Sequence, residues 1–287
     1  MKKCAILTMD FIQDFVVYDK LLNQPLNKLG WVVEHISWHK QGIDWNQFEA
    51  VIIRSTWDYQ DDAEAFLHVL QEIENSTAVL LNSLKIVQWN INKNYLREVH
   101  DKGAKIIPTI WLEQFNFDSI ENYFAHFKTN QIIIKPTISA NSDNTFWLQK
   151  ESFKNDKQRL ENSLKNRQLM VQPFVPAIIE QGEYSLFYFN NRFSHSILKT
   201  PKSGDFRVQE EHGGHLQSIQ PSPALMQAAE NAMQTLPEKV LYARIDLVEF
   251  QGDYHLMEIE LIEPSLYFNL DKNAAPRFAQ AFDDWMR

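Results

Sequence analysis

The chain has 287 residues, enough for one large domain or for two to three small domains with buried cores. Hydrophobic residues make up 44% of the chain and charged residues 23%, a balance typical of globular proteins that excludes an intrinsically disordered chain. The net charge of −9 argues against a general nucleic-acid-binding or anionic-membrane surface, and the single cysteine, Cys4, excludes an intrachain disulfide and a cysteine-based zinc site.

The first 88 residues alternate short β-branched runs with helix-like stretches. Strands are expected at residues 4–8, 31–38, 49–55 and 78–83, and an amphipathic helix over residues 61–74, where apolar residues recur at 66, 67, 70 and 73. This βαβ order predicts a parallel sheet. The first apolar run is broken by Asp10, so we expect neither a signal peptide nor a membrane span there, and we expect a cytoplasmic protein.

From about residue 130 the apolar runs come in pairs with short polar connections. They cover residues 132–136, 145–149, 169–175, 183–189, 192–199, 243–250 and 254–263. This pattern predicts antiparallel sheets with helices packed on them. A domain boundary is expected near residue 88, without a flexible linker, because the chain has only 8 glycines.

The last two runs form a predicted hairpin whose outer face carries acids. A three-residue loop, Gln251 to Asp253, gives the cross-strand pairs Phe250 with Tyr254, Asp246 with Glu258, and Arg244 with Glu260. The opposite face then carries Ile245, Leu247, Met257, Ile259 and Leu261, so the register is strongly specified.

Two interpretations of these acids remain open. Directly opposed carboxylates repel each other, and a bound divalent cation would reverse the sign of that interaction. Rigidly held carboxylate oxygens suit Mg²⁺, which takes further ligands from waters and substrate phosphates. Alternatively, Arg244 neutralises the acids on a solvated face of the sheet.

Four basic residues stand where a strand, helix or loop would direct them toward a ligand. Lys93 opens a helix-like stretch, Lys135 and Lys199 end apolar strands, and Arg207 lies in a loop that contains glycines. Each alone could be a surface cation, but together with the acidic hairpin they indicate a site for metal and phosphates. A zinc site at His212 and His215 is a weak alternative, because paired glycines do not hold two imidazoles as a helix would.

The order of these pieces resembles the ATP-grasp enzymes, and within them the glutathione synthetase-like branch. The resemblance runs from Lys93 through residues 132–136, 171–214 and 243–250 to residues 256–265. Residues 44–59 further resemble a bacterial subgroup that includes the ligase closing the ring of D-cycloserine. The resemblance implies an α/β and α+β fold: a parallel α/β domain over residues 1–88, then an ATP-grasp domain over residues 89–287 with a lid at about 118–175 and a C-terminal antiparallel sheet.

The resemblance also implies the roles of individual residues. Lys93 and Lys135 would hold the ATP phosphates, Glu183 would meet the ribose, and the adenine hinge would consist of Gln172, Pro173, Phe174 and Val175. Lys199 and Arg207 would face the transferred phosphate and the substrate carboxylate, with Gln209, Gly213 and Gly214 beside them. Asp246, Glu258 and Glu260 would hold two Mg²⁺ ions, or Mn²⁺.

Two positions depart from the family pattern. The loop after Lys135 has no glycine, although Asn141, Ser142, Asp143 and Asn144 can form tight turns and donate hydrogen bonds, so that Ser142 is a candidate phosphate ligand. Glu260 stands where glutathione synthetases commonly carry asparagine, and the added charge should tighten metal binding.

The implied reaction is ATP-dependent ligation. A small-molecule carboxylate would be activated as an acyl phosphate, with release of ADP, and an amine or other nucleophile would then displace phosphate. The substrate candidates are Arg54, Ser55, Thr56, Trp57 and Tyr59, which follow a buried strand where α/β sheets bind ligands. Trp57 and Tyr59 could instead only pack a domain interface. A kinase and a non-catalytic nucleotide-binding module remain alternatives, and self-association is left open.

Overall fold

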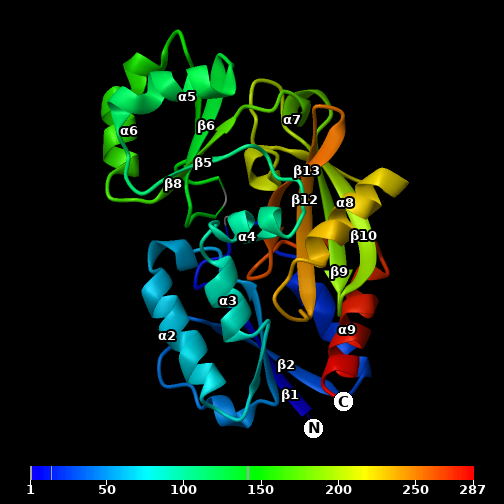
Figure 1. Ribbon diagram of the computed structural model, residues 1–287. Helices are drawn as coiled ribbons and strands as arrows, with labels where there is room; N and C mark the ends of the chain where they lie inside the picture. The colour runs from blue at the N-terminus through cyan, green and yellow to red at the C-terminus, as the bar shows by residue number, and fades with distance from the viewer. Residues whose placement is uncertain (1, 14, 141) are drawn as a thin grey trace.

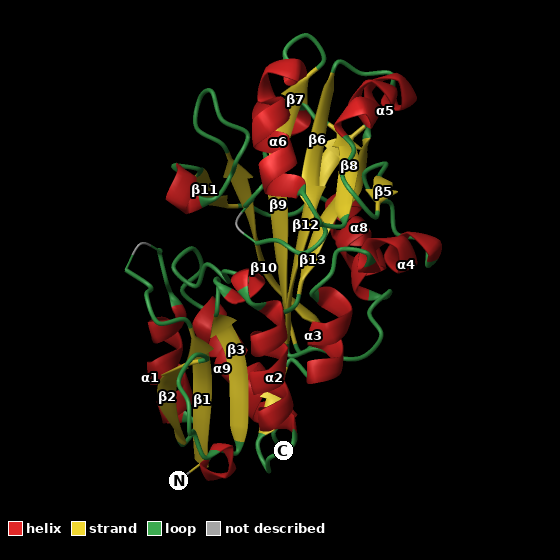
Figure 2. Cartoon of the chain, turned by 90° about the vertical axis from the view of Figure 1, so that its left-hand side faces the viewer, coloured by secondary structure: helices red, strands yellow, loops and turns green. Residues whose placement is uncertain are grey.

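The computed structural model describes residues 2–13, 15–140 and 142–287, so Asn141 of the predicted phosphate loop lies outside the described residues. The described chain forms three sheets (Figure 1). The N-terminal sheet and its helices lie at one end of the molecule, and the other two sheets lie at the opposite end (Figure 2).

The N-terminal sheet is parallel throughout, as predicted, with strand order β2-β1-β3-β4. Its elements are β1 (Lys2–Thr8), η1 (Asp19–Leu22), α1 (Asn23–Lys28), β2 (Trp31–Ser37), β3 (Ala50–Ser55), α2 (Ala63–Glu74) and β4 (Val79–Leu81). Asp62 caps α2, because its Oδ1 accepts a hydrogen bond from Ala65 N at 3.0 Å. Phe66, Leu70 and Ile73 of α2 are buried, which confirms its predicted apolar face.

The central sheet is antiparallel, with strand order β11-β10-β9-β12-β13. Its strands are β9 (Glu183–Phe189), β10 (Arg192–Thr200), β11 (His215–Ser218), β12 (Tyr242–Phe250) and β13 (Asp253–Glu260). The helices in this part of the chain are α3 (Leu84–Asn90), α4 (Tyr95–Asp101), α7 (Ala177–Glu180), α8 (Pro223–Met233) and α9 (Ala274–Trp285). The predicted domain boundary near residue 88 falls within α3.

Two hydrophobic cores cover the central sheet. In one core, Ile245 of β12 packs with Leu225 of α8. The other core contains Phe187 of β9, Phe278 of α9 and Ile6 of β1. The C-terminal helix therefore joins the central sheet to the N-terminal sheet, and it lies beside the N-terminal strands in Figure 1.

The third sheet has its own core and the order β5-β8-β6-β7. It contains β5 (Ile110–Leu112), α5 (Ile120–Phe127), β6 (Gln131–Pro136), β7 (Phe146–Gln149), α6 (Lys157–Leu164) and β8 (Leu169–Pro173). All three strand pairs are antiparallel, as predicted for the strands after residue 130, whereas β5 was not predicted. We call this unit the lid. Its first strand, β5, lies before the range 118–175 that the sequence indicated for it.

The β12–β13 hairpin differs from the prediction near its tip. Phe250 pairs with Asp253, so the turn has two residues, Gln251 and Gly252, both with positive φ (55° and 84°). The predicted three-residue loop and the predicted pair of Phe250 with Tyr254 are therefore wrong. A β-bulge at Met257 then adds one residue to β13.

The bulge restores the predicted pairs where the acids lie. Asp246 pairs with Glu258 and Arg244 with Glu260, as predicted. Met257 was expected on the core face, but it lines a cleft, and Leu256 takes its place in the core. The turn offset and the bulge cancel, because each shifts the register by one residue.

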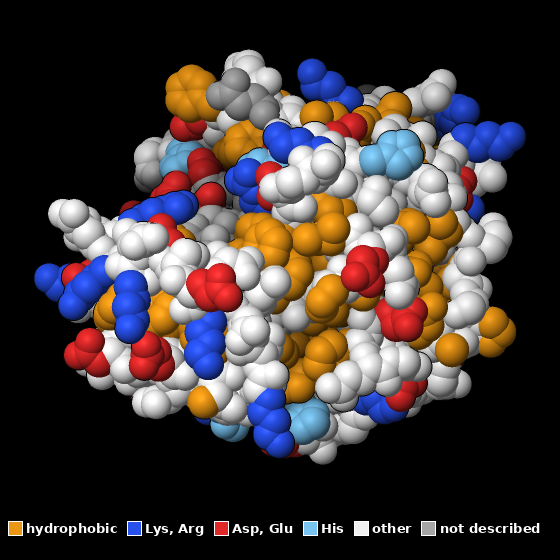
Figure 3. All heavy atoms as spheres, turned by 90° about the horizontal axis from the view of Figure 1, so that it is seen from above, with side chains coloured by type: hydrophobic (Ala, Val, Ile, Leu, Met, Phe, Trp, Pro, Cys, Tyr) orange, Lys and Arg blue, Asp and Glu red, His pale blue; other side chains and the backbone are white. Residues whose placement is uncertain are grey.

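The surface of the described chain shows two further features. Basic and acidic side chains are intermixed on the face seen in Figure 3, so that face has no broad field of one charge. No helix in the described part of the chain is long and apolar enough to cross a membrane.

Candidate active site

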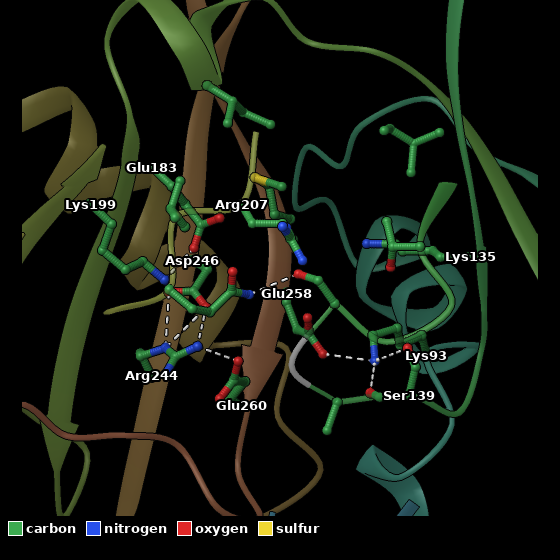
Figure 4. A pocket seen from close by; sticks show the side chains of 18 of the residues that line it. Lys93, Lys135, Ser139, Glu183, Lys199, Arg207, Arg244, Asp246, Glu258 and Glu260 are labelled. Carbon is green, nitrogen blue, oxygen red and sulfur yellow. Dashed lines mark hydrogen bonds and ion pairs between the residues drawn. The ribbon is translucent and has the colours of Figure 1, made fainter. Parts of the chain in front are cut away.

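A cleft of about 1560 Å³, counted with its open mouth, lies where the lid, the central sheet and the segment after β3 meet. Thirteen predicted ATP, metal and catalytic residues line it: Lys93, Lys135, Ser142, Gln172, Pro173, Phe174, Val175, Glu183, Lys199, Arg207, Asp246, Glu258 and Glu260. Figure 4 shows lining side chains that converge from both sides of the cleft and labels ten of them. Sequence positions as far apart as 93 and 260 are thus brought together by the fold.

One end of the cleft is largely apolar. The predicted hinge forms its wall at the end of β8, where Phe174 stacks on Trp147 with ring centroids 4.3 Å apart. Gln172 is fixed because its Nε2 donates to Thr109 Oγ1 at 3.0 Å. Ile133 and Ile178 complete this end, which can take a flat apolar ring.

Two lysines reach the cleft from the start of α4 and from β6. Lys93 Nζ donates to Ser139 O at 2.6 Å and lies 3.1 Å from Glu258 Oε1. Lys135 has no hydrogen-bond or ion-pair partner among the described residues, and Figure 4 shows its amine apart from the carboxylates. Burial lowers the pKa of Lys135, an effect that Glu258 opposes and Lys93 strengthens. An anion at this position would offset the cost of partly removing that ammonium group from water.

The hairpin acids are each held by a cation. Arg244 Nη2 lies 2.9 Å from Asp246 Oδ2 and also binds Glu260, and Lys199 Nζ lies 3.4 Å from Asp246 Oδ1 and also binds Glu183 (Figure 4). Arg244 was assigned only a neutralising role from the sequence, yet it lines the cleft.

These cations decide the pKa values of the acids. Burial alone would raise the pKa of Asp246, but Arg244 and Lys199 outweigh it and lower that pKa. Burial raises the pKa of Glu260 to about 7, with Arg244 opposing the shift and the carboxylates of Asp246 and Glu258 adding to it. The three carboxyl groups of the hairpin therefore carry more potential negative charge than Arg244 can neutralise.

Asp246, Glu258 and Glu260 have the oxygen atoms that a metal ion needs as ligands, although their side chains are not arranged around one. Among the described residues, no group of three His, Cys, Asp or Glu side chains has metal-binding geometry. Instead, Arg244 forms ion pairs with Asp246 and Glu260, and Lys93 forms an ion pair with Glu258. The donors are hard oxygens on directly paired strands, which is the chemistry that Mg²⁺ requires.

The loop between β10 and β11 brings Arg207 and Gln209 to the cleft. Arg207 Nη2 lies 2.7 Å from Asp205 Oδ2, and Gln209 Nε2 donates to Ser142 Oγ at 2.8 Å, which links this loop to the lid. Gly213 and Gly214 do not line the cleft, contrary to the prediction. Gly213 has a φ of 81°, and a side chain at Gly214 would overlap the backbone of Val208, so both glycines shape the loop.

The predicted substrate residues after β3 divide into two groups. Trp57 and Tyr59 line the cleft, whereas Arg54, Ser55 and Thr56 do not. The expectation that Arg54 meets the substrate is therefore corrected. Its Nε donates to Asp19 Oδ1 at 3.0 Å and its Nη2 to Pro264 O at 2.6 Å, so the guanidinium joins two parts of the fold.

Sequence reasoning missed several lining residues, of which Glu263 is chemically the most distinctive. Burial raises its pKa well above the ordinary range, and Glu260 and Glu258 add to the shift while Lys93 and Arg244 oppose it. The alternation of acids in residues 254–263 was the available signal, but β13 ends at Glu260, so that alternation does not extend to Glu263.

Comparisons with known proteins agree with this geometry. Residues 104–274 match the family described as prokaryotic glutathione synthetase, ATP-grasp domain, and residues 4–82 match the N-terminal domain of D-cycloserine synthetase DcsG. Over 281 residues the chain is 26% identical to the cycloserine biosynthesis protein DcsG of Streptomyces lavendulae, covering 93% of each chain.

Solved structures show the same fold. The crystal structure of D-cycloserine synthetase DcsG aligns with a TM-score of 0.88 at 24% identity, covering 99% of this chain and 100% of that chain. The D-alanine–D-alanine ligase of Bacillus anthracis aligns with a TM-score of 0.67 at 11% identity, covering 100% and 97%. The ATP-grasp ligase PsnB, complexed with a minimal precursor, aligns with a TM-score of 0.68 at 14% identity, covering 100% and 99%.

Proposed function

The chain belongs to the prokaryotic glutathione synthetase family of ATP-grasp domains, and we propose from this membership that it is an ATP-dependent ligase of small carboxylates. ATP phosphorylates a substrate carboxylate to an acyl phosphate and leaves as ADP. An amine or other nucleophile then attacks the acyl carbon, and inorganic phosphate leaves. Catalysis of this kind consists mainly of positioning and charge neutralisation.

The observation that carries this proposal is the unpaired ammonium group of Lys135 beside Lys93 in the cleft. Two converging cations, one of them without a partner among the described residues, suit the α- and β-phosphates of ATP. The apolar hinge, Gln172 to Val175, would bind the adenine and Glu183 the ribose. Lys199 and Arg207 would then face the transferred phosphate and the substrate carboxylate, and Ser142 would contact the phosphates from the lid loop.

Asp246, Glu258 and Glu260 would hold Mg²⁺, two ions in all, with Mn²⁺ as a substitute. A bound divalent ion neutralises phosphate charge and fixes the orientation of the phosphates. In its absence Arg244 and Lys93 hold the acids, so these cations would change partners when ATP and metal bind. The directly opposed pair of Asp246 and Glu258 supports the assignment.

We also propose the domain division into residues 1–88 and 89–287, with the lid near 118–175, and a cytoplasmic site of action. The similarity to a D-cycloserine synthetase along nearly the whole chain favours ring-closing ligation over linear peptide synthesis. A non-catalytic nucleotide-binding module is not favoured, because the complete set of charged residues lines one cleft.

Oxygen-18 labelling tests the reaction. Carboxylates that stimulate ADP release in the presence of amines should be labelled in the carboxylate group, and the label should appear in released inorganic phosphate. The reason is that one carboxylate oxygen must leave with the phosphate of an acyl phosphate. Formation of AMP and pyrophosphate would contradict the proposal, and a stable phosphorylated product would identify a kinase instead.

A further inference from the structure

The segment that follows β13, residues 262–266, has no regular secondary structure, yet its backbone is held at every residue. Each of its five carbonyl oxygens lies within hydrogen-bond distance of a side chain. Ile262 O lies 2.9 Å from Tyr242 Oη, Glu263 O lies 2.8 Å from Trp57 Nε1, and Pro264 O lies 2.6 Å from Arg54 Nη2. Ser265 O lies 3.3 Å from Arg244 Nη1, and Leu266 O lies 3.1 Å from His195 Nε2. Trp57 and Arg54 come from the N-terminal part of the chain, and the other three come from the central sheet. The position of the segment is therefore fixed from two sides.

This fixed segment presents Glu263 to the cleft. Glu263 lines the cleft, the residue is only 9% exposed, and its carboxyl group has no hydrogen bond or ion pair within the described ranges 2–13, 15–140 and 142–287. The other cleft acids described above differ, because Asp246, Glu258 and Glu260 each contact a lysine or an arginine. A buried carboxyl group without its own cation favours a ligand that brings one.

The surroundings of Glu263 suit a cation of small size. Trp57, whose Nε1 donates to Glu263 O, and Tyr59, whose pKa Glu263 helps to raise, also line the cleft, and aromatic faces attract cations. Arg207 also lines the cleft and can take a substrate carboxylate by its planar fork. A ligand that carries both charges would thus meet an acid and a base held on different loops.

We propose that Glu263 binds the ammonium group of the substrate, with Trp57 and Tyr59 beside it, so that the ligase selects amino-acid zwitterions over simple carboxylates. This assignment rests on the proposed ligase function and adds a specificity-determining residue to it.

The test compares matched carboxylates in the wild-type protein. D- and L-alanine and D- and L-serine are set against propionate and 3-hydroxypropionate, with ATP, Mg²⁺ and hydroxylamine as nucleophile, and ADP release is measured. The amino compounds should give about 10–100-fold higher kcat/KM, the usual value of a hydrogen bond to a charged group. Equal activity of the compounds without an amino group would overturn the proposal.

Glu263→Gln keeps the shape of the side chain and removes its ability to carry a negative charge. We expect this variant to lose the preference for amino compounds through a raised KM, with the affinity for ATP unchanged. Glu211→Gln is the matched control, because Glu211 also lines the cleft but is exposed. A preference that survives in Glu263→Gln contradicts the assignment, and the wild-type comparison decides the question if this variant does not fold.

Different results would contradict the assignment of Glu263 and the proposed ligase function. If ATP binds but none of the four amino acids stimulates ADP release, the assignment of Glu263 is wrong and ATP binding stands. If ATP itself does not bind, the proposed function falls first.

Discussion

His195 shows how one buried residue can carry part of the stability of the site. Arg277 Nε donates to Ser194 Oγ at 2.9 Å, and Ser194 Oγ lies 3.0 Å from His195 Nδ1. Because His195 Nε2 faces Leu266 O, the neutral ring donates from Nε2 and accepts at Nδ1. Burial lowers the pKa of His195 to about 4, against the pull of the Leu266 carbonyl, with Arg277 adding to the shift.

This low pKa predicts a pH dependence of stability. The unfolded histidine, with a pKa of 6.5, binds a proton at a higher pH than the folded one, so its contribution is complete above pH 6.5 and is lost as the pH falls toward 4. The loss is on the order of 3 kcal/mol. Urea unfolding between pH 7.5 and 4.5 should show a flatter curve for His195→Gln than for the wild type.

The exposed His68, on α2, provides the control. The His68→Gln protein should follow the wild-type curve of unfolding free energy against pH. If the curve of His195→Gln also runs parallel to that of the wild type, the assignment of a neutral, buried His195 is incorrect.

Single residues also show where sequence reasoning ends. Lys93 and Lys135 could be predicted to meet a ligand because each stands at the start or end of a recognisable element, whereas the hinge was predicted through the family resemblance. Arg54 could not be assigned correctly, because its partner, the carbonyl group of Pro264, lies 210 positions later in the chain. The hydrophobic pattern of the sequence predicts where helices and strands end, but it does not predict which distant carbonyl group an arginine side chain will bind.

At the scale of elements, the turn between α7 and β9 determines how two site residues meet. Gly182 has a φ of 110°, and a Cβ atom there would lie 2.6 Å from Lys199 O. Glu183 follows directly and pairs with Lys199 across the sheet. Only glycine lets β9 and β10 approach closely enough at this point.

Gly182→Ala should therefore destabilise the protein more than a positive φ alone explains. Gly103 is the matched control, because its φ is 101° and a Cβ atom there would meet nothing within 4 Å. Gly103→Ala should lower the free energy of unfolding by about 1–2 kcal/mol, and Gly182→Ala by roughly a further 1–3 kcal/mol from overlap. Urea unfolding gives both values, and equal losses would show that the overlap relaxes without cost.

The sheets were predictable from periodicity, and the exceptions have physical causes. Strands β9 and β12 have continuous or alternating apolar residues and were recognised nearly to their ends. Strand β11 has only four residues (HLQS) and no fully buried position, so it carries no hydrophobic signal. The bulge at Met257 also gives no hydrophobic signal in the sequence, because it arises where the register set by the turn differs by one residue from the register at Asp246 and Glu258.

At the scale of the whole molecule, the cleft lies between parts that meet through buried polar contacts. Asn82, which follows β4, donates from Nδ2 to Tyr242 O at 3.0 Å and to Leu261 O at 2.7 Å. The lid keeps a separate core and meets the loop of residues 201–214 through Gln209 and Ser142. A ligand held by the lid and the central sheet together should therefore stabilise the whole chain.

ATP with Mg²⁺ should raise the free energy of unfolding by roughly 2.7 kcal/mol at about 100 times its Kd. Lys135→Ala should remove most of this gain, because it deletes a phosphate partner. Its stability without ATP should stay level or rise, since the ammonium group is half-buried and has no partner among the described residues. Thermal unfolding with and without ATP measures both effects.

Lys150→Ala is the control, because Lys150 is exposed in the same lid and is not among the residues that line the cleft. It should keep the full response to ATP. A normal response in Lys135→Ala would remove this lysine from the phosphate site, and no response in the wild type would remove ATP from the function.

The bulge at Met257 separates the tip of the β12–β13 hairpin from its base. A three-residue turn, Gln251 to Asp253, would make the bulge unnecessary and pair Phe250 with Tyr254 while Asp246 still faced Glu258. Met257 would then turn from the cleft to the core face. The length of an exposed turn thus decides which side chain of β13 faces the cleft, without the replacement of any charged residue.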